Sequence, residues 1–229
     1  MATSTTTTFD LNIDDIIQEA YERCGGRTNS GYDLKSARRS LNILFSEWGN
    51  RGIHLWKVAL NEQALTNGTA TYTAPSNAND ILEAYVSTTS GQTATTNDVS
   101  LTKISRSEYA TLPNKGSKGQ PSQYYVDRLT TPTITLYQTP DASTYTHLKY
   151  YYLKRIEDSG AYTNTADVVF RFIPCMVAGL AYYISMKVNP QMTQQNKLIY
   201  EDELSRALNE DGQRTSVYIT PQTYYPRGI

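Results

Sequence analysis

The sequence predicts an α+β fold: a helical bundle from the N- and C-terminal thirds, with an inserted antiparallel β region and an extended C-terminal tail. Apolar residues recur at spacings of three and four in the outer thirds of the 229 residues, and they alternate with polar residues in the middle. The end of the chain has Pro221, Pro226 and no helical period. The predicted divisions are 1–54 for the N-terminal helices, 55–158 for the β region, 159–212 for the C-terminal helices and 213–229 for the tail.

The longest apolar segment runs from Asp167 to Val188 and is expected to be the centre of the core. Its apolar residues follow one wide stripe of a helix: Val168, Val169, Phe172, Ile173, Met176, Val177, Leu180, Ala181 and Ile184. Pro174 predicts a helix start or a kink just before it, because proline lacks a backbone N–H. A membrane span is the competing interpretation, but Arg171 and Lys187 bracket an apolar run shorter than the roughly 20 residues that a bilayer requires.

Two amphipathic helices are expected before residue 55. The first follows Asn12, whose side chain can cap it, and ends at Gly25, which favours a left-handed backbone. Its inward positions are Ile13, Ile16, Ile17, Ala20, Tyr21 and Cys24. The second runs from about 33 to 48. It is expected to bury Leu34, Ala37, Leu41, Leu44, Phe45 and Trp48, and we predict that Leu44, Trp48 and Phe172 are core positions.

In the middle of the chain the apolar period changes to two, as in half-buried strands. Strands are expected at 56–60, 65–72, 81–87, 101–105, 123–128, 133–138 and 144–155. Asn67 and Gly68 offer a two-residue turn, so the first two strands are expected to form a hairpin. Ser105 and Glu108 have the spacing of a capping box, which predicts a short helix from Arg106 to Thr111.

Two further segments complete the chain. Residues 88–98 are rich in Thr, Ser and Gly and are expected to form a loop or a projecting hairpin tip. A last helix is expected from 191 to 209, after Asn189 and Pro190 end its predecessor. Its apolar side contains Ile199, Leu204, Ala207 and Leu208, and its solvated side contains Glu201, Asp202 and Glu203.

The composition is that of a mixed globular protein. With 21 basic and 22 acidic residues the formal net charge is −1, which gives no electrostatic case for tight, general nucleic-acid binding. Cys24 and Cys175 fall on apolar helix faces and are expected to be reduced. No secretory signal is visible at the N-terminus, so synthesis and assembly in a cytoplasm are expected. The 19 tyrosines suit interfaces as well as strands.

Candidate chemistry is sparse. Lys35, Arg38 and Arg39 on the second helix could belong to a helix-turn-helix, although such cations more often form a solvated or partner-facing side. His54 and His147 have no Cys or His cluster with ligand spacing around them, so no zinc site is expected. Carboxylate pairs such as Glu19 with Glu22, or Glu201 with Glu203, lie on predicted helix surfaces. We therefore expect no catalytic activity and no cofactor.

Several segments resemble the head-to-tail adaptor, or connector, proteins of short-tailed bacteriophages. Phe9 to Leu11 and Asp15 to Gly25 are similar to the start of that family. The similarity continues through residues 31–34, 37–42, 47–53, 55–56, 121–128 and 170–183. These are fold motifs spread over nearly the whole chain, so they speak for the family rather than for individual roles.

The resemblance implies a structural virion protein, not an enzyme. It implies a dodecameric ring between the portal protein and the tail nozzle protein, which joins head to tail and continues the channel for DNA ejection. Genomic DNA would pass without specific binding, no membrane would be involved, and the ring, assembled in the host cytoplasm, would lie at the head–tail junction. The alternative is a phage-particle hydrolase or carbohydrate-binding domain, which needs paired carboxylates in a cleft or an aromatic platform.

Two sets of residues are candidates for contacts in such a ring. Since DNA must slide past the channel wall, that wall is expected to be acidic or neutral, and Glu201, Asp202 and Glu203 are candidates for it. The tail from Gln213 to Ile229 is expected to dock on the portal or on a neighbouring subunit, as an added strand or in grooves. Its candidate partner-binding residues are Val217, Tyr218, Ile219, Tyr224, Tyr225 and Arg227. A frayed terminus is the alternative for this tail.

Overall fold

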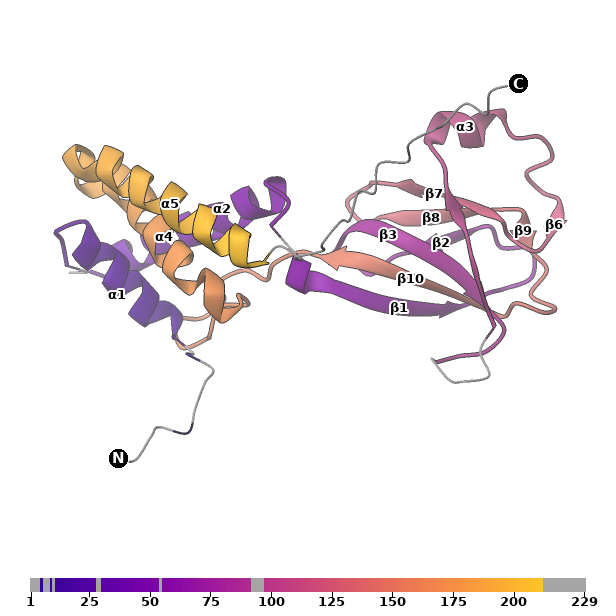
Figure 1. Cartoon of the computed structure of the whole chain (residues 1–229), viewed down its shortest axis with the longest axis horizontal. Helices are drawn as coiled ribbons and strands as arrows, with labels where there is room; N and C mark the ends of the chain where they lie inside the picture. The colour runs from indigo at the N-terminus through magenta and orange to yellow at the C-terminus, as the bar shows by residue number, and fades with distance from the viewer. Residues whose placement is uncertain are drawn as a thin grey trace, which may run out of the picture.

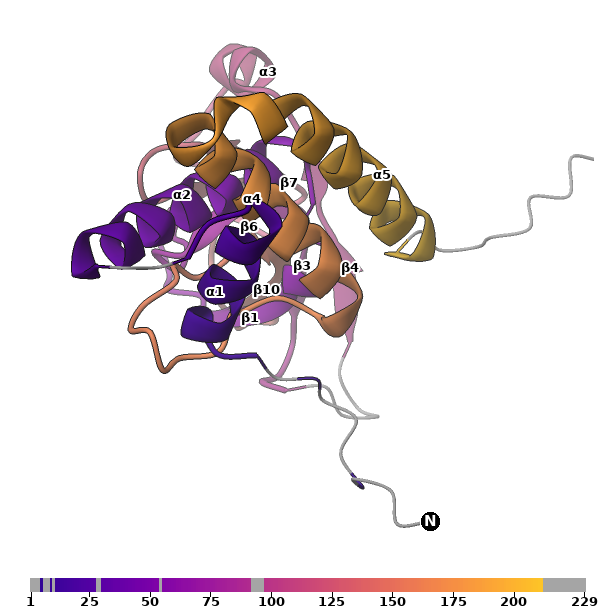
Figure 2. The ribbon, with the colours of Figure 1, turned by 90° about the vertical axis from the view of Figure 1, so that its left-hand side faces the viewer.

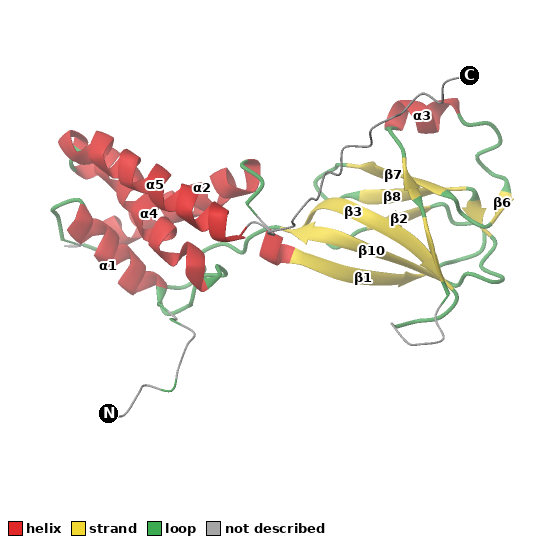
Figure 3. Ribbon diagram, viewed as in Figure 1, coloured by secondary structure: helices red, strands yellow, loops and turns green. Residues whose placement is uncertain are grey.

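Helices and strands occupy opposite ends of the molecule (Figure 1 and Figure 3). The structure, a computed structural model, describes residues 5, 9, 11–27, 30–53, 55–91 and 97–211. The helical part contains α1 (Ile13–Arg23), α2 (Gly31–Asn50), η2 (Phe170–Phe172), α4 (Ile173–Val188), η3 (Pro190–Met192) and α5 (Thr193–Asp211). The strand-rich part contains η1 (Leu55–Lys57), ten strands and α3 (Arg106–Thr111).

The strands form two four-stranded sheets and one short pair. The first sheet has the order β1 (Val58–Ala64), β10 (His147–Lys154), β3 (Ala78–Ser87) and β4 (Asp98–Ser100). The second has the order β2 (Thr71–Thr73), β8 (Thr133–Tyr137), β7 (Gln123–Asp127) and β5 (Thr102–Lys103). The pair is β6 (Lys118–Gly119) with β9 (Thr139–Pro140). Buried side chains of both large sheets, among them Ile81, Ile134 and Tyr150, share one core.

The predicted fold class was wrong. Among the described residues the chain has five α-helices and ten strands in three sheets, so it is mixed, and the strands are not one antiparallel set. Strands β5 and β7 are parallel, as are β6 and β9. In place of the predicted bundle, α1, α2 and α5 pack around α4. Five of the strands are only two or three residues long, and the parallel ones among them pair with later or earlier segments about 20 residues away, which the local apolar period does not reveal.

The predicted hairpin through Asn67 and Gly68 was also wrong. Strand β1 pairs with β10, from Val58 opposite Leu153 to Ala64 opposite His147, whereas β2 pairs with β8 in the other sheet. Gly68 does adopt a turn conformation, with φ of +83°. The chain therefore turns here as expected, but the turn leads from one sheet to the other and does not fold β1 back on itself.

Helix α4 is the centre of the helical core. Leu44, Trp48 and Phe172 have no exposed surface, which confirms the three predicted core positions. The helix begins at Ile173, directly before Pro174, and a single 3-10 turn precedes it, so proline marks a helix start and not a kink. None of the described helices is long and apolar enough to span a membrane. Helix α3 confirms its predicted capping box, since Ser105 and Glu108 bond each other's backbone N–H.

Gly179 in α4 allows close contact with α2 and α5 and yields a testable prediction. A Cβ at this position would lie 2.9 Å from both Leu44 Cδ1 and Tyr200 Cε2, whereas a Cβ at Gly49 in α2 would meet no atom within 4 Å. Gly49→Ala is expected to raise the free energy of unfolding by about 0.5–1 kcal/mol, because alanine loses less backbone entropy on folding. Gly179→Ala is expected to lower it by about 1 kcal/mol, because the clash outweighs that gain. Urea unfolding of both variants measures the difference, and equal gains would contradict it.

Candidate assembly surfaces

The three carboxylates predicted to face a channel lie on α5 and point in different directions. Consecutive residues of a helix are about 100° apart around its axis, so Glu201, Asp202 and Glu203 do not share one face. Glu201 points towards α2, where its two oxygens each accept a hydrogen bond of 3.2 Å from Arg51. Asp202 lies 2.6 Å and Glu203 3.7 Å from guanidinium nitrogens of Arg206. The solvated face of α5 is thus a set of ion pairs.

Arg51 joins the end of α2 to α5. Its guanidinium lies 2.6 Å from Glu47 and 3.2 Å from Glu201, and the ring of Tyr200 lies beneath it. The hydrogen bonds from Arg51 hold the pKa of the Glu201 carboxyl below its ordinary value. Since these side chains are 24–44% exposed, solvent screens the pairs and their contribution to stability is small. Their main effect is to fix the orientation of the carboxylates.

A buried polar chain lies under this surface. The Trp48 indole N–H donates to the Tyr200 hydroxyl at 3.0 Å, and the Tyr183 hydroxyl donates to Glu47 at 3.0 Å. Burial, together with the hydrogen bond to Glu47, raises the pKa of Tyr183 to about 12. These tyrosines therefore serve the junction of α2, α4 and α5, a role that tyrosine content alone does not reveal.

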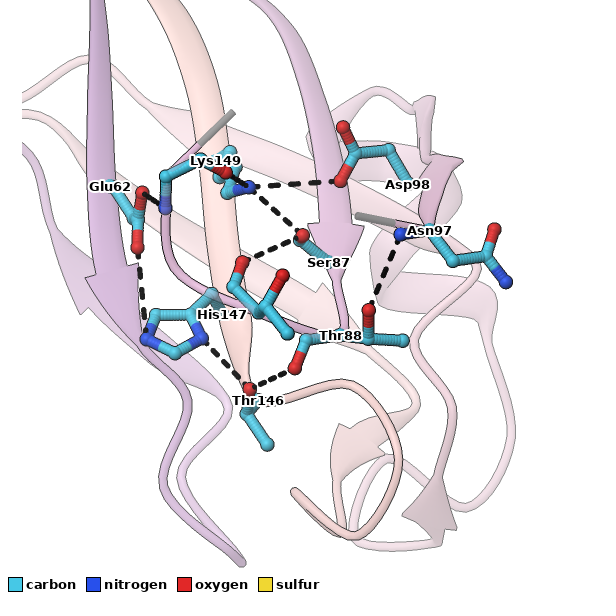
Figure 4. Close-up of polar contacts among 10 residues, drawn as sticks. Glu62, Ser87, Thr88, Asn97, Asp98, Thr146, His147 and Lys149 are labelled. Atoms are coloured by element: carbon cyan, nitrogen blue, oxygen red, sulfur yellow. Dashed lines mark hydrogen bonds and ion pairs between the residues drawn. The ribbon is translucent and has the colours of Figure 1, made fainter. Parts of the chain in front are cut away.

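A lysine without exposed surface lies on the outer face of the first sheet (Figure 4). Leu148 and Tyr150 point into the core between the sheets, so the alternation of β10 directs Lys149 to the opposite face. There its ammonium group donates to Ser87 Oγ at 2.9 Å and to the Gly91 carbonyl, and it lies 3.8 Å from Asp98. The chain after β3 therefore covers this part of the sheet face.

Further contacts hold the same segment on the sheet (Figure 4). The N–H of Gly91 donates to Glu62 of β1 at 2.9 Å, and the other oxygen of Glu62 lies 3.7 Å from His147. The Thr146 hydroxyl contacts the His147 ring at 2.8 Å and donates to the Thr88 carbonyl at 2.8 Å. The loop base is thus attached to β1 and β10 by charged and polar groups from several strands.

The comparisons with known proteins place the chain in a family. The family model described as SU10 adaptor protein matches residues 4–224. The chain belongs to the SU10 adaptor protein family. The predicted resemblance to phage head-to-tail adaptors is confirmed at this level, and the match covers both the helical and the strand-rich part of the adaptor. A search of curated proteins found no match. As an adaptor, the protein is a structural component of the phage virion that acts in head–tail assembly.

The predicted partner-binding residues of the adaptor are not placed. Val217, Tyr218, Ile219, Tyr224, Tyr225 and Arg227 lie outside the described residues, and so do residues 92–96 of the predicted loop between 88 and 98. Sequence reasoning missed Lys149, which its alternation with Leu148 and Tyr150 assigns to the outer, nominally solvated sheet face. Nothing in that alternation shows that the segment after β3, some 60 residues earlier in the chain, covers this face.

The cations of α2 have separate roles in the adaptor. Arg38 donates to the Gly160 carbonyl at 3.0 Å and lies over the ring of Tyr162, so it ties α2 to the segment before η2. Lys35 and Arg39 are exposed. Among the residues that the structure describes, no group of three or more His, Cys, Asp or Glu side chains is arranged to hold a metal ion. Cys24 and Cys175 are free and buried, and burial raises the pKa of both thiols.

Proposed function

We propose that this adaptor forms a dodecameric ring between the portal protein and the tail nozzle protein and continues the channel for DNA ejection. The observation that carries the proposal is the family match over residues 4–224, which includes every described helix and strand. The elongated subunit supports it, because helices and strands at opposite ends offer different surfaces to partners above and below (Figure 1). Within the subunit, residues 1–54 with 159–212, and residues 55–158, are proposed to act as separate units, and 213–229 as a docking tail.

We propose further that α5 lines the channel. Arg51 and Arg206 are already paired with Glu47, Glu201 and Asp202, so this surface offers DNA no concentrated positive charge. Each lysine or arginine bound to phosphate would displace counterions and hold the DNA, which a channel for sliding DNA must avoid. A structural and not a catalytic role is proposed for these carboxylates, because Glu201 and Glu203 diverge around the helix and contact different arginines.

Electron microscopy of the full-length protein mixed with its portal tests both proposals. The expected result is a coaxial ring of twelve copies on the portal, with α5 next to the bore. A chain that stays monomeric beside intact portal rings would contradict the ring, and a map with α5 on the outer rim would contradict the channel assignment. Truncation after Gly212 is the matched variant: it is expected to keep the melting temperature and to weaken co-migration with portal rings, since the tail is proposed to dock there or on a neighbour.

A further inference from the structure

Among the residues that the structure describes, β1 is an edge strand that pairs on one side only. It ends the sheet order β1-β10-β3-β4 and lies along the lower margin of the strand-rich part in Figure 1 and Figure 3. Just beyond β1, the N–H of Leu65 donates to the carbonyl of Thr146, the residue before β10, at 2.7 Å. From there the register between β1 and β10 continues without a shift to Val58. Odd-numbered residues of β1 therefore bond β10. Even-numbered residues, among them Val58, Leu60 and Glu62, direct their backbone N–H and C=O groups away from the sheet.

This edge has little of the usual protection against further pairing at its Val58 end. Exposed edges are commonly shielded by charged side chains, especially Lys, by Pro, a bulge, a very short strand or a covering loop. The one charged residue of β1, Glu62, accepts a hydrogen bond from the Gly91 N–H of the loop base. Strand β1 is seven residues long and regular, it contains no Lys or Pro, and two of its side chains on the outer face are apolar and exposed: Val58 at 40% and Leu60 at 37%. The opposite edge, β4, has only three residues. Strand β1 is therefore the long open edge of the first sheet.

We propose that residues 216–220 of a neighbouring copy add to β1 as a fifth strand of this sheet. The inference rests on the proposed ring and names the place where the tail docks. The segment reads Ser-Val-Tyr-Ile-Thr: it is uncharged, rich in β-branched residues and free of Gly and Pro. Its backbone N–H and C=O groups can form hydrogen bonds with the outward C=O and N–H groups of β1. Val217 and Ile219 alternate on one face, as Val58 and Leu60 do, and can form cross-strand apolar pairs with them.

The direction of α5 bears on which copy supplies the added strand. Figure 2 shows α5 running out on the side of β4, away from β1. The described part of α5 thus ends on the side opposite this edge, and the 17 residues from Gln213 to Ile229 can span up to about 55 Å when fully stretched. In the proposed ring, contacts between identical copies are head to tail, and we place the β4 side of one subunit against the β1 side of the next. Each tail then reaches the open edge of the following copy.

Disulfide trapping in rings on the portal tests the exchange. The full-length double variant Leu60→Cys/Ile219→Cys is oxidised and run on a non-reducing gel, with Cys24 and Cys175 left in place because they are buried. A ladder of cross-linked copies is expected. Mixing chains with Leu60→Cys only and Ile219→Cys only should give mixed dimers. The matched control is Ile43→Cys/Ile219→Cys, since Ile43 is exposed on α2 and should give no ladder.

Each alternative outcome overturns the proposal in a distinguishable way. A fast-migrating monomer in the double variant would show the tail on its own β1, and a cross-link to portal alone would show a different receptor. Intact rings without cross-links would overturn the strand exchange while the proposed function stands. Absence of rings on the portal in the parent protein would overturn both.

A second variant, Leu60→Pro, removes one outward N–H without touching the β10 ladder. It should keep the melting temperature and speed ring dissociation at least about tenfold; unchanged dissociation would also overturn the exchange.

Discussion

Phe172→Ala is expected to lower the free energy of unfolding by about 3–5 kcal/mol, because it opens a cavity at the centre of the helical core. The ring has no exposed surface, and its centroid lies 5.7 Å from that of Trp48 and 4.8 Å from that of Trp56. For a chain of this length the melting temperature should fall by roughly 6–20 °C. Calorimetry and urea unfolding measure the change, and ring formation should fail in parallel because the subunit no longer folds stably.

Phe170→Ala is the matched control for this loss. Phe170 lies two residues earlier in the same 3-10 turn and is 59% exposed. The centroid of its ring lies 6.3 Å from that of Phe9. Its removal should change the free energy of unfolding by less than about 1 kcal/mol. Equal stability of the Phe170 and Phe172 variants would contradict the assignment of Phe172 to the core.

Lys149→Met is expected to cost on the order of 3 kcal/mol although methionine fills a similar volume. The loss arises from the partners, since Ser87 Oγ and the Gly91 carbonyl lose their donor and Asp98 loses its cation. Hydrogen exchange should also show a weaker hydrogen bond between the Gly91 amide and Glu62, because the segment is no longer held on the sheet.

Lys154→Met provides the comparison for that variant. Lys154 lies on the same strand but is partly exposed, so its charge is not buried among fixed partners. We expect a change within about 0.5 kcal/mol at this position. If both methionine variants were as stable as the parent, the desolvation cost of burying Lys149 would equal what its contacts contribute, and the network would not stabilise the loop base.

Local signals predicted local features well. The capping box of Ser105 and Glu108, the helix start at Pro174 and the burial of Trp48 depend on residues close in sequence or on a helical period, and the structure has all three. The family resemblance was also readable from the chain. Periodicity indicates which face of an element is buried, and in these cases that information was sufficient.

Features that depend on distant partners were not predicted. Alternation in β1 indicated a strand, but its partner is β10, which begins 83 residues after β1 ends. The turn nearest to β1 in sequence therefore predicted the wrong partner. Glu201 is exposed, as predicted, but its contact with Arg51, 150 residues away, was not predicted. Lys149 is buried because a loop crosses a face that alternation alone assigns to water. In each case the missing information is a long-range pairing and not a local propensity.

The adjacency of β1 and β10 has a mechanical consequence for a virion component. The chain enters the strand-rich part at η1 and leaves it after Lys154, and Val58 and Leu153 at that end are direct neighbours in the sheet. The chain therefore connects the helical part to the strand-rich part twice, by two segments that lie side by side, and a pulling force between the two parts is shared by both segments. The β1–β10 ladder is not peeled open by such a load, because both of its strands are drawn in the same direction.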